Sequence, residues 1–153
     1  MVLAAFEMLK TVEDLARREG PVTWGVRIGI HSGPVISGLI GYRRFAQDIW
    51  GDTVNYASRM ESSGARNCIN ISERTYSRIK DFFECEPRGK VITKDKREAD
   101  MYFVNGILPT LIDNSSQSPP PAFLRRYRVY FQKDPPAFPS FLTAVDHNLT
   151  HAT

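Results

Sequence analysis

Hydrophobic residues follow a helical period at the start of the chain and a strand period immediately after it. Over residues 1–19 they recur every three or four positions with charged residues between them, which predicts one amphipathic helix. The pair Gly20-Pro21 would end that helix. Over residues 22–31 apolar residues occupy every second position, as in a strand with one buried face. The beginning of the chain therefore predicts a helix followed by a strand.

Short apolar runs separated by turn residues predict the remaining elements up to residue 107. The predicted helices cover residues 51–61 and 73–81. Ser72 lies where its side chain can cap the second of these helices. The predicted strands cover residues 35–40, 44–49, 68–71, 82–86, 91–93 and 101–107. Helices mixed with hairpins predict an α+β fold, in which helices pack on a mainly antiparallel sheet.

The character of the sequence changes after this point. The run SSQSPPP, residues 115–121, is typical of a flexible or extended linker. Residues 123–131 fit either a short strand or a helix, and the prolines and small polar residues from Asp134 onwards predict little order. We therefore expect a folded domain over residues 1–107 and a Ser/Pro-rich tail, partly disordered, over residues 108–153.

Charge, cysteine content and hydropathy limit the classes of function. The net charge of +3 is mildly basic, which allows an anionic ligand but does not by itself indicate nucleic acid. Cys68 and Cys85 are the only cysteines and form no disulfide or metal-binding pattern, which favours a reducing compartment. No stretch approaches the ~18 apolar residues of a membrane span, and the first ten residues lack the basic leader of a signal peptide. We expect a cytoplasmic protein with no membrane segment in this chain.

The run DIWGDTVNYASR, from Asp48 to Arg59, carries the candidate chemistry. Asn55 and Arg59 are four positions apart on a predicted helix, so their side chains share one face. The planar, permanently charged guanidinium of arginine suits charge that develops on phosphoryl oxygens. The spacing alone fits a surface arginine on an amphipathic helix even better.

Longer motifs distinguish these possibilities. The runs GVRIGIHSGPVISGLIG, FAQDIWGDTVNYASRMES, RGKVITKDK and MYFVNG occur in this order over roughly residues 22–106. Together they resemble the second half of the class III adenylyl/guanylyl cyclase catalytic domain. The resemblance implies a ferredoxin-like sandwich of the nucleotide cyclase type.

The resemblance also implies roles for individual residues. Asp48 matches the position at which adenylyl cyclases recognise adenine. A carboxylate there accepts a hydrogen bond from the adenine amino group. Asn55 matches the residue that orients the ribose, and Arg59 the residue that stabilises the α-phosphate during attack by the 3′-hydroxyl. Lys94 matches the lysine that holds the terminal phosphates of ATP, with Lys96 as a rival in register.

Two further sites have structural interpretations. His31, in the turn GIHSG, is expected to be a hydrogen-bonding structural residue rather than a base or a metal ligand. Arg43 and Arg44 lie in the hairpin that forms a dimer arm in the family, where contact with a partner subunit and simple solvation are equally compatible with the sequence.

The family's metal site is the feature that finds no match. Family members bind Mg²⁺ or Mn²⁺ through two aspartates on an earlier strand and a following hairpin, and nothing before Val22 matches these elements. The resemblance thus implies an N-terminally truncated domain whose metal ligands are absent from this chain. Family members act as head-to-tail dimers with shared sites, so we expect this chain to be inactive alone and to pair with a cyclase domain in a homo- or heterodimer.

Two functions remain compatible with the sequence. One is an adenylate cyclase-type domain in cyclic nucleotide signalling, which converts ATP to cyclic AMP and pyrophosphate. The alternative is a non-catalytic dimerisation or regulatory pseudo-cyclase module. The absent metal-binding aspartates favour the second for this chain, whereas retention of Asp48, Asn55 and Arg59 favours descent from the first. An RNA-binding ferredoxin-like domain is disfavoured because MYFVNG lacks the glycine-aromatic stacking motif, so no nucleic-acid partner is expected.

Overall fold

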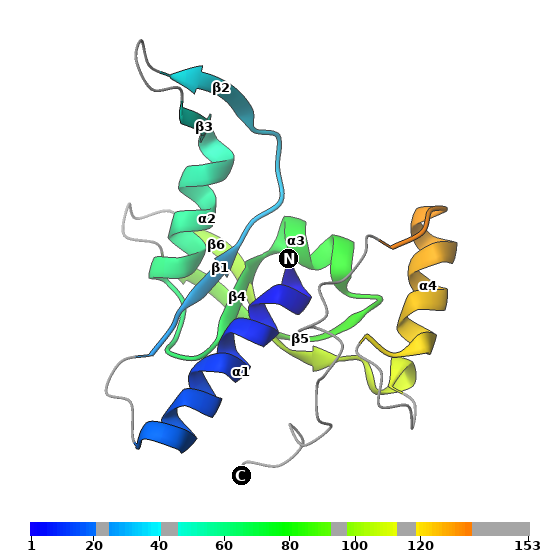
Figure 1. Ribbon diagram of the computed structural model, residues 1–153. Coiled ribbons are helices and arrows are strands. Elements are labelled where there is room, and N and C mark those ends of the chain that lie inside the picture. Colours follow the sequence, from blue (N-terminus) through cyan, green and yellow to red (C-terminus); the bar gives the residue numbers. More distant parts are fainter. Residues whose placement is uncertain (21–24, 41–45, 93–97, 113–118, 136–153) are drawn as a thin grey trace.

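A computed structural model describes residues 1–20, 25–40, 46–92, 98–112 and 119–135 of the 153-residue chain (Figure 1). Its centre is a four-stranded sheet in the order β1-β4-β6-β5. These strands are β1 (Ile28–Ile30), β4 (Ile69–Ser72), β6 (Glu98–Ile107) and β5 (Phe83–Ile92). β1 and β4 are parallel, whereas β4 with β6 and β6 with β5 are antiparallel. The predicted α+β class with a mainly antiparallel sheet is confirmed.

Alternation along the strands divides the interior into two cores. On β4, Ile69 and Ile71 belong to one buried cluster, and Asn70 between them points to the opposite face. On β6, Val104 belongs to the first cluster, and Met101 to a second. Each face of the sheet is therefore covered by different helices.

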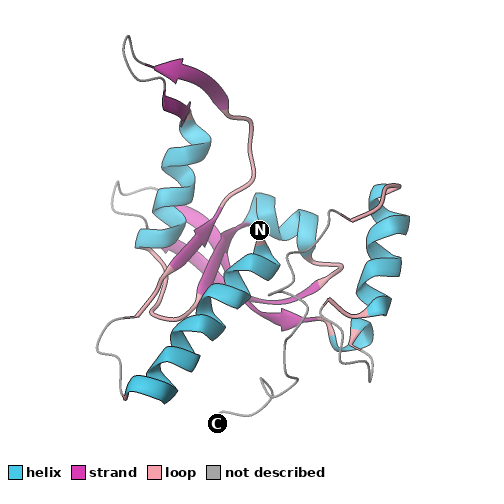
Figure 2. Cartoon of the chain, viewed as in Figure 1, coloured by secondary structure: helices cyan, strands magenta, loops and turns pink. Residues whose placement is uncertain are grey.

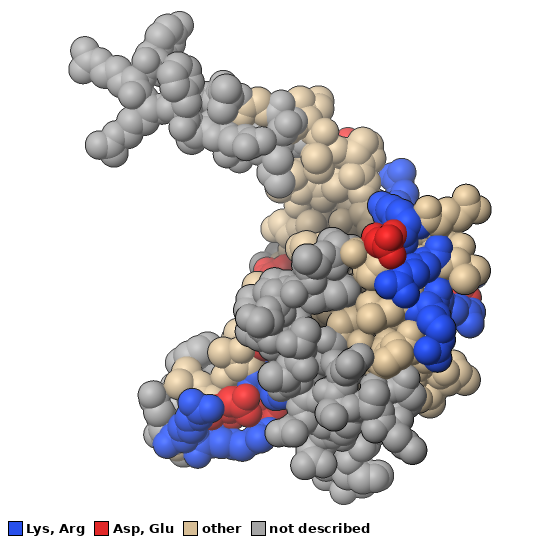
Figure 3. Space-filling view, turned by 45° about the vertical axis from the view of Figure 1, so that its right-hand side comes forward, with Lys and Arg blue, Asp and Glu red and all other residues tan. Residues whose placement is uncertain are grey.

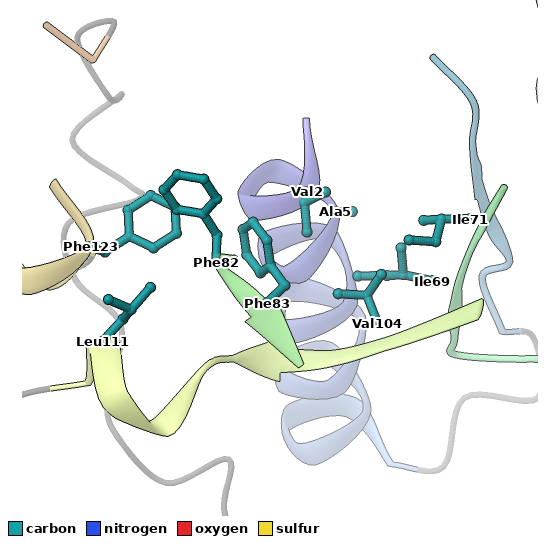
Figure 4. Packing of buried hydrophobic residues seen from close by; sticks show 9 residues of the cluster. All are labelled: Val2, Ala5, Ile69, Ile71, Phe82, Phe83, Val104, Leu111 and Phe123. Carbon is teal, nitrogen blue, oxygen red and sulfur yellow. The ribbon is translucent and has the colours of Figure 1, made fainter. Parts of the chain in front are cut away.

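The first face is covered by α1 (Val2–Glu19), α3 (Glu73–Ile79) and α4 (Pro121–Phe131). Its centre is a group of buried apolar side chains (Figure 4), namely Val2, Ala5, Ile69, Ile71, Phe82, Phe83, Val104, Leu111 and Phe123. The ring of Phe123 lies 5.3 Å from that of Phe82 and 5.6 Å from that of Phe83, centroid to centroid. These aromatic contacts attach α4 to the domain.

The second face is covered by α2 (Asp52–Ser62). Met60 of this helix is fully buried against Ala99 and Met101 of β6. At Gly29 the backbones of β1 and α2 come very close, because a methyl group placed there would lie 2.7 Å from the carbonyl oxygen of Ala57 and nearer still to the amide nitrogen of Glu61. Glycine is therefore required at this position by packing.

A second, separate sheet extends from the body of the domain. It consists of β2 (Ile36–Ile40) and β3 (Ala46–Trp50), which pair antiparallel and project away from the four-stranded sheet (Figures 1 and 2). We call β2 and β3 the arm. Val35 is 50% exposed and Ile36 71% exposed at its base. A two-stranded hairpin is only marginally stable alone.

The predicted first strand is longer than β1, and β5 was predicted as two separate strands. Of the predicted strand 22–31 only Ile28–Ile30 pairs in the sheet, and residues 21–24 lie outside the described part. Val26 instead bonds to Asn67, whose left-handed backbone turns the chain away before the ladder can continue. The separate predictions 82–86 and 91–93 are one strand, β5, interrupted by a register shift between Pro87 and Lys90.

Other local predictions agree with the structure. The Ser72 hydroxyl accepts a hydrogen bond from the Thr75 amide at 3.4 Å and so caps α3 as predicted. Of the two possibilities for residues 123–131, the helix is correct. Arg125, Arg126 and Arg128 are exposed on it, and basic side chains gather along this side of the molecule (Figure 3).

None of the helices in the described part of the chain is both long enough and apolar enough to cross a bilayer.

We predict that Gly29→Ala destabilises the domain by about 1–3 kcal/mol, because the added methyl must push α2 away from β1. Urea unfolding would measure the loss. Gly106→Ala is the matched control, since a methyl there meets nothing within 4 Å. Equal stabilities for the two variants would contradict the close contact.

Candidate functional site

The beginning of α2 is fixed to the turn that follows β1. Gly51 precedes the helix with φ of 127°, a conformation that favours glycine. The Thr53 hydroxyl donates a hydrogen bond to the Pro34 carbonyl at 2.6 Å, and a methyl on Gly33 would collide with Thr53. The turn therefore sets the point at which α2 leaves the arm.

Asn55 and Arg59 lie one turn apart on α2, as the sequence predicted. Asn55 is exposed and Arg59 is half-buried. The guanidinium carbon of Arg59 is 5.8 Å from the centroid of the Tyr56 ring, which places the charge beside an aromatic face. An exposed amide next to a partly screened cation is an arrangement that can bind a polar, anionic ligand.

The Tyr56 ring is in turn supported by His31. The two ring centroids are 4.5 Å apart, and Nδ1 of His31 is 2.7 Å from the Ser72 hydroxyl oxygen. Burial, followed by the positive charge of Arg74, lowers the pKa of His31 below its usual value. These contacts agree with the structural role expected for this histidine.

The other predicted site residues are placed less completely. Asp48 belongs to β3, paired with Gly38 across the arm and four positions before the first residue of α2. Asp48 and Asn55 therefore lie on consecutive elements of the chain. The side chain of Asp48 lies outside the described part. Lys94 and Lys96 fall within residues 93–97, which also lie outside it.

Among the described residues no three histidine, cysteine, aspartate or glutamate side chains converge on one point. The described residues therefore offer no clustered set of three protein ligands for a Mg²⁺ or Mn²⁺ ion, and Mg²⁺ can also bind through one or two carboxylates together with substrate phosphates. Burial, with a smaller contribution from Glu84, raises the pKa of the Cys85 thiol to about 11, so it stays protonated and poorly nucleophilic near neutral pH.

Two residues that hold the other end of α2 were not singled out from the sequence. Asn70 and Arg88 donate hydrogen bonds to carbonyl groups in and just after the last turn of the helix. The available signals were a polar residue inside the apolar strand INIS and an arginine before a glycine at a strand irregularity. Neither signal indicates a partner on α2.

The family described as adenylate and guanylate cyclase catalytic domain matches residues 1–106. An adenylate cyclase of Mycobacterium tuberculosis is 41% identical over 81 residues, which are 53% of this chain and 18% of that protein. This chain therefore spans less than a fifth of the length of that relative.

Solved structures of both cyclase types are similar to the domain. The adenylyl cyclase CyaB from P. aeruginosa aligns with a TM-score of 0.55 and 31% identity, over 71% of this chain and 54% of that one. The guanylate cyclase domain of RhGC from Catenaria anguillulae, solved in complex with GTP, aligns with a TM-score of 0.52 and 32% identity, over 68% of this chain and 60% of that one. The alignments support the fold and leave the choice of purine open.

We predict that the stability of the domain falls as the pH drops below about 6.5, the value for histidine in an unfolded chain. The pKa of His31 is lowered in the folded state, so the unfolded state binds more protons in this range and is favoured as the pH falls, until the pH passes below the folded pKa. Urea unfolding between pH 7.5 and 5.5 would measure the slope.

His31→Gln should remove this component of the pH dependence. His147→Gln, a change outside the described residues, is the control and should keep it. An identical slope in the wild type and in His31→Gln would show that another group causes the effect.

Proposed function

The chain belongs to the adenylate and guanylate cyclase catalytic domain family, and we propose that it supplies the purine- and transition-state-binding half of an adenylyl cyclase site. The reaction is attack of the 3′-hydroxyl of ATP on its α-phosphorus, which forms cyclic AMP and releases pyrophosphate. The observation that carries the proposal is the pair on α2, with exposed Asn55 one turn from half-buried Arg59.

Each residue of the pair has a distinct part in this proposal. Asn55 is exposed and can donate and accept hydrogen bonds, which suits the hydroxyl and ring oxygens of a ribose. Arg59 offers a fixed positive charge beside Tyr56, which suits the charge that grows on α-phosphate oxygens as the bond to pyrophosphate breaks. Lys94 is proposed to bind the terminal phosphates.

The purine is proposed to be adenine because Asp48 carries a carboxylate. A carboxylate accepts a hydrogen bond from the adenine amino group, whereas guanine presents a carbonyl oxygen at the same place and would be repelled. The position of Asp48 on β3, next in the chain to α2, supports a shared site with Asn55.

A complete site is proposed to need a second cyclase domain. The described residues hold no cluster of three or more histidine, cysteine, aspartate or glutamate side chains, and the arm leaves apolar side chains at its base exposed. We infer that the 153-residue chain alone is inactive, and that a head-to-tail partner supplies the metal-binding half. A purely regulatory role in such a dimer is the alternative that the experiments below would reveal.

The first test mixes this chain with a full-length cyclase whose own Asn–Arg pair has been removed. Cyclic AMP production should be undetectable for either protein alone and should appear in the mixture. Arg59→Ala should lower kcat of the mixture by about 10²–10³-fold, as loss of one charge-stabilising donor does elsewhere. Arg78→Ala, an exposed arginine on α3, is the control and should leave kcat unchanged.

Activity of the chain alone would refute the inferred need for a partner. An inactive mixture, with dimer formation still detected by ultracentrifugation, would support the regulatory alternative instead.

The second test concerns the purine. Asp48→Asn replaces one acceptor by an amide that can also donate to the guanine carbonyl, so the preference for ATP over GTP should fall by about 10–100-fold in kcat/KM. The measurement is the ratio of the two kcat/KM values in the mixture. Asp52→Asn, at the start of α2, is the control. An unchanged ratio would remove Asp48 from purine recognition.

A further inference from the structure

The end of α2 has an unusual set of hydrogen-bond partners. The amide of Ser63 donates to the carbonyl of Arg59, and the amide of Gly64 donates to that of Glu61, each at 3.0 Å. The carbonyls of Met60 and Ser63 receive side-chain donors instead, from Asn70 at 2.8 Å and from Arg88 at 2.7 Å. The sheet thus completes the helix end, where carbonyl groups lack partners within the helix.

Asn70 is fully buried and uses both ends of its amide. Its nitrogen donates to the Met60 carbonyl and lies 3.3 Å from the sulfur of Met101, while its oxygen accepts a hydrogen bond from Arg88 at 3.0 Å. Because a buried amide is costly unless it is hydrogen-bonded, these partners hold its orientation. Asn70 therefore links the helix, β6 and Arg88.

Arg88 reaches the helix because β5 is irregular at this point. Pro87 pairs with Tyr102 and Lys90 with Asp100, so β5 has one residue more than β6 between these pairs. Gly89 has φ of 70°, which is typical of a bulge that redirects a neighbouring side chain.

The redirected guanidinium is held on several sides. Its carbon lies 4.3 Å from the centroid of the Phe103 ring, and one nitrogen donates to both Ser63 and Asn70. A positive charge at the carboxyl end of a helix is also favoured by the helix dipole. The group is therefore placed by packing, hydrogen bonds and charge together.

We propose that Arg88 and Asn70 are positioning residues that fix α2 on the sheet and thereby set the positions of Asn55 and Arg59. Neither residue is assigned contact with the nucleotide. The pair holds the carboxyl end of the helix, as Gly29 allows its close approach and Thr53 fixes its beginning. The proposal rests on the proposed function, because it is Asn55 and Arg59 that must be positioned.

The first test needs no enzymatic activity. Hydrogen exchange of the 153-residue chain is compared for wild type, Arg88→Ala and Arg88→Lys. Amides of residues 60–64 should exchange about 10–100-fold faster in Arg88→Ala, as expected for loss of a charged hydrogen bond. Arg88→Lys, which keeps the charge but not the planar fork, should show a smaller increase.

Two control variants remove comparable but unrelated contacts. Arg126→Ala removes an ion pair between α4 and Asp81, and Asn105→Ala removes an exposed hydrogen bond to Glu86 on the same strand pair. Neither should change exchange in residues 60–64. Equal acceleration over the whole sheet in Arg88→Ala, or none in α2, would overturn the proposal. If the alanine variant does not fold, Arg88→Lys and Asn70→Ser provide the same comparison.

The second test measures kcat and KM in the mixture with a partner cyclase, below the melting temperature of every variant. Arg88→Ala should lower kcat by about 10–100-fold with KM within about twofold, since a small displacement of catalytic groups has such effects. Leu111→Ala, which weakens the core on the other face, should lower the melting temperature without this loss. Equal kcat values for folded Arg88→Ala and Leu111→Ala would overturn the positioning role.

The two tests separate this inference from the function on which it rests. If Arg59→Ala leaves the activity of the mixture unchanged, the proposed function fails while the exchange result still decides whether Arg88 holds α2. If Arg59→Ala abolishes activity and Arg88→Ala does not lower it, the function stands and the positioning role fails.

Discussion

The backbone of α2 lies directly against β1 at Gly29, where the Ala57 carbonyl and the Glu61 backbone leave no space for a side chain. This contact brings the helix close enough for Met60 to be fully buried beneath it. It also brings the end of the helix within hydrogen-bonding distance of β4 and β5. The place of Asn55 and Arg59 therefore follows from a packing constraint at a residue that has no side chain.

The strands serve both faces of the sheet at once. On β4, Ile69 and Ile71 pack in the core beneath α1, while Asn70 faces α2 and bonds to it. Successive side chains on a strand point in opposite directions, so the same stretch of backbone positions residues in both cores. The apolar core thus provides the rigid platform on which a small polar network can fix the helix.

The arm and the body differ in how far their apolar side chains are covered by the chain itself. The body is covered on both faces by its own helices, including α4, whose aromatic face packs on Phe82 and Phe83. The arm is a two-stranded sheet whose base carries the exposed Val35 and Ile36. In the proposed function the arm meets a partner subunit, which would cover these side chains and join the two halves of the site.

Local sequence patterns determined most of the elements and the candidate pair. The helical period predicted α1 and α2, the spacing of Asn55 and Arg59 put them on one face, and Ser72 marked the start of α3. Period and capping are visible in sequence because they depend on residues a few positions apart. The functional roles of Asp48, Asn55, Arg59 and Lys94 remain predictions.

Tertiary structure decided what local patterns could not. Alternation over residues 22–31 predicted a long strand, yet pairing stops where Asn67 turns the chain. Pro87 and Gly89 suggested a break, yet the strand continues through a bulge that aims Arg88 at α2. Arg88 and Asn70 lie on β5 and β4, 25 and 10 residues after the carbonyl groups at the end of α2 that they contact. Such contacts depend on which strands become neighbours, and that is fixed only when the whole core packs.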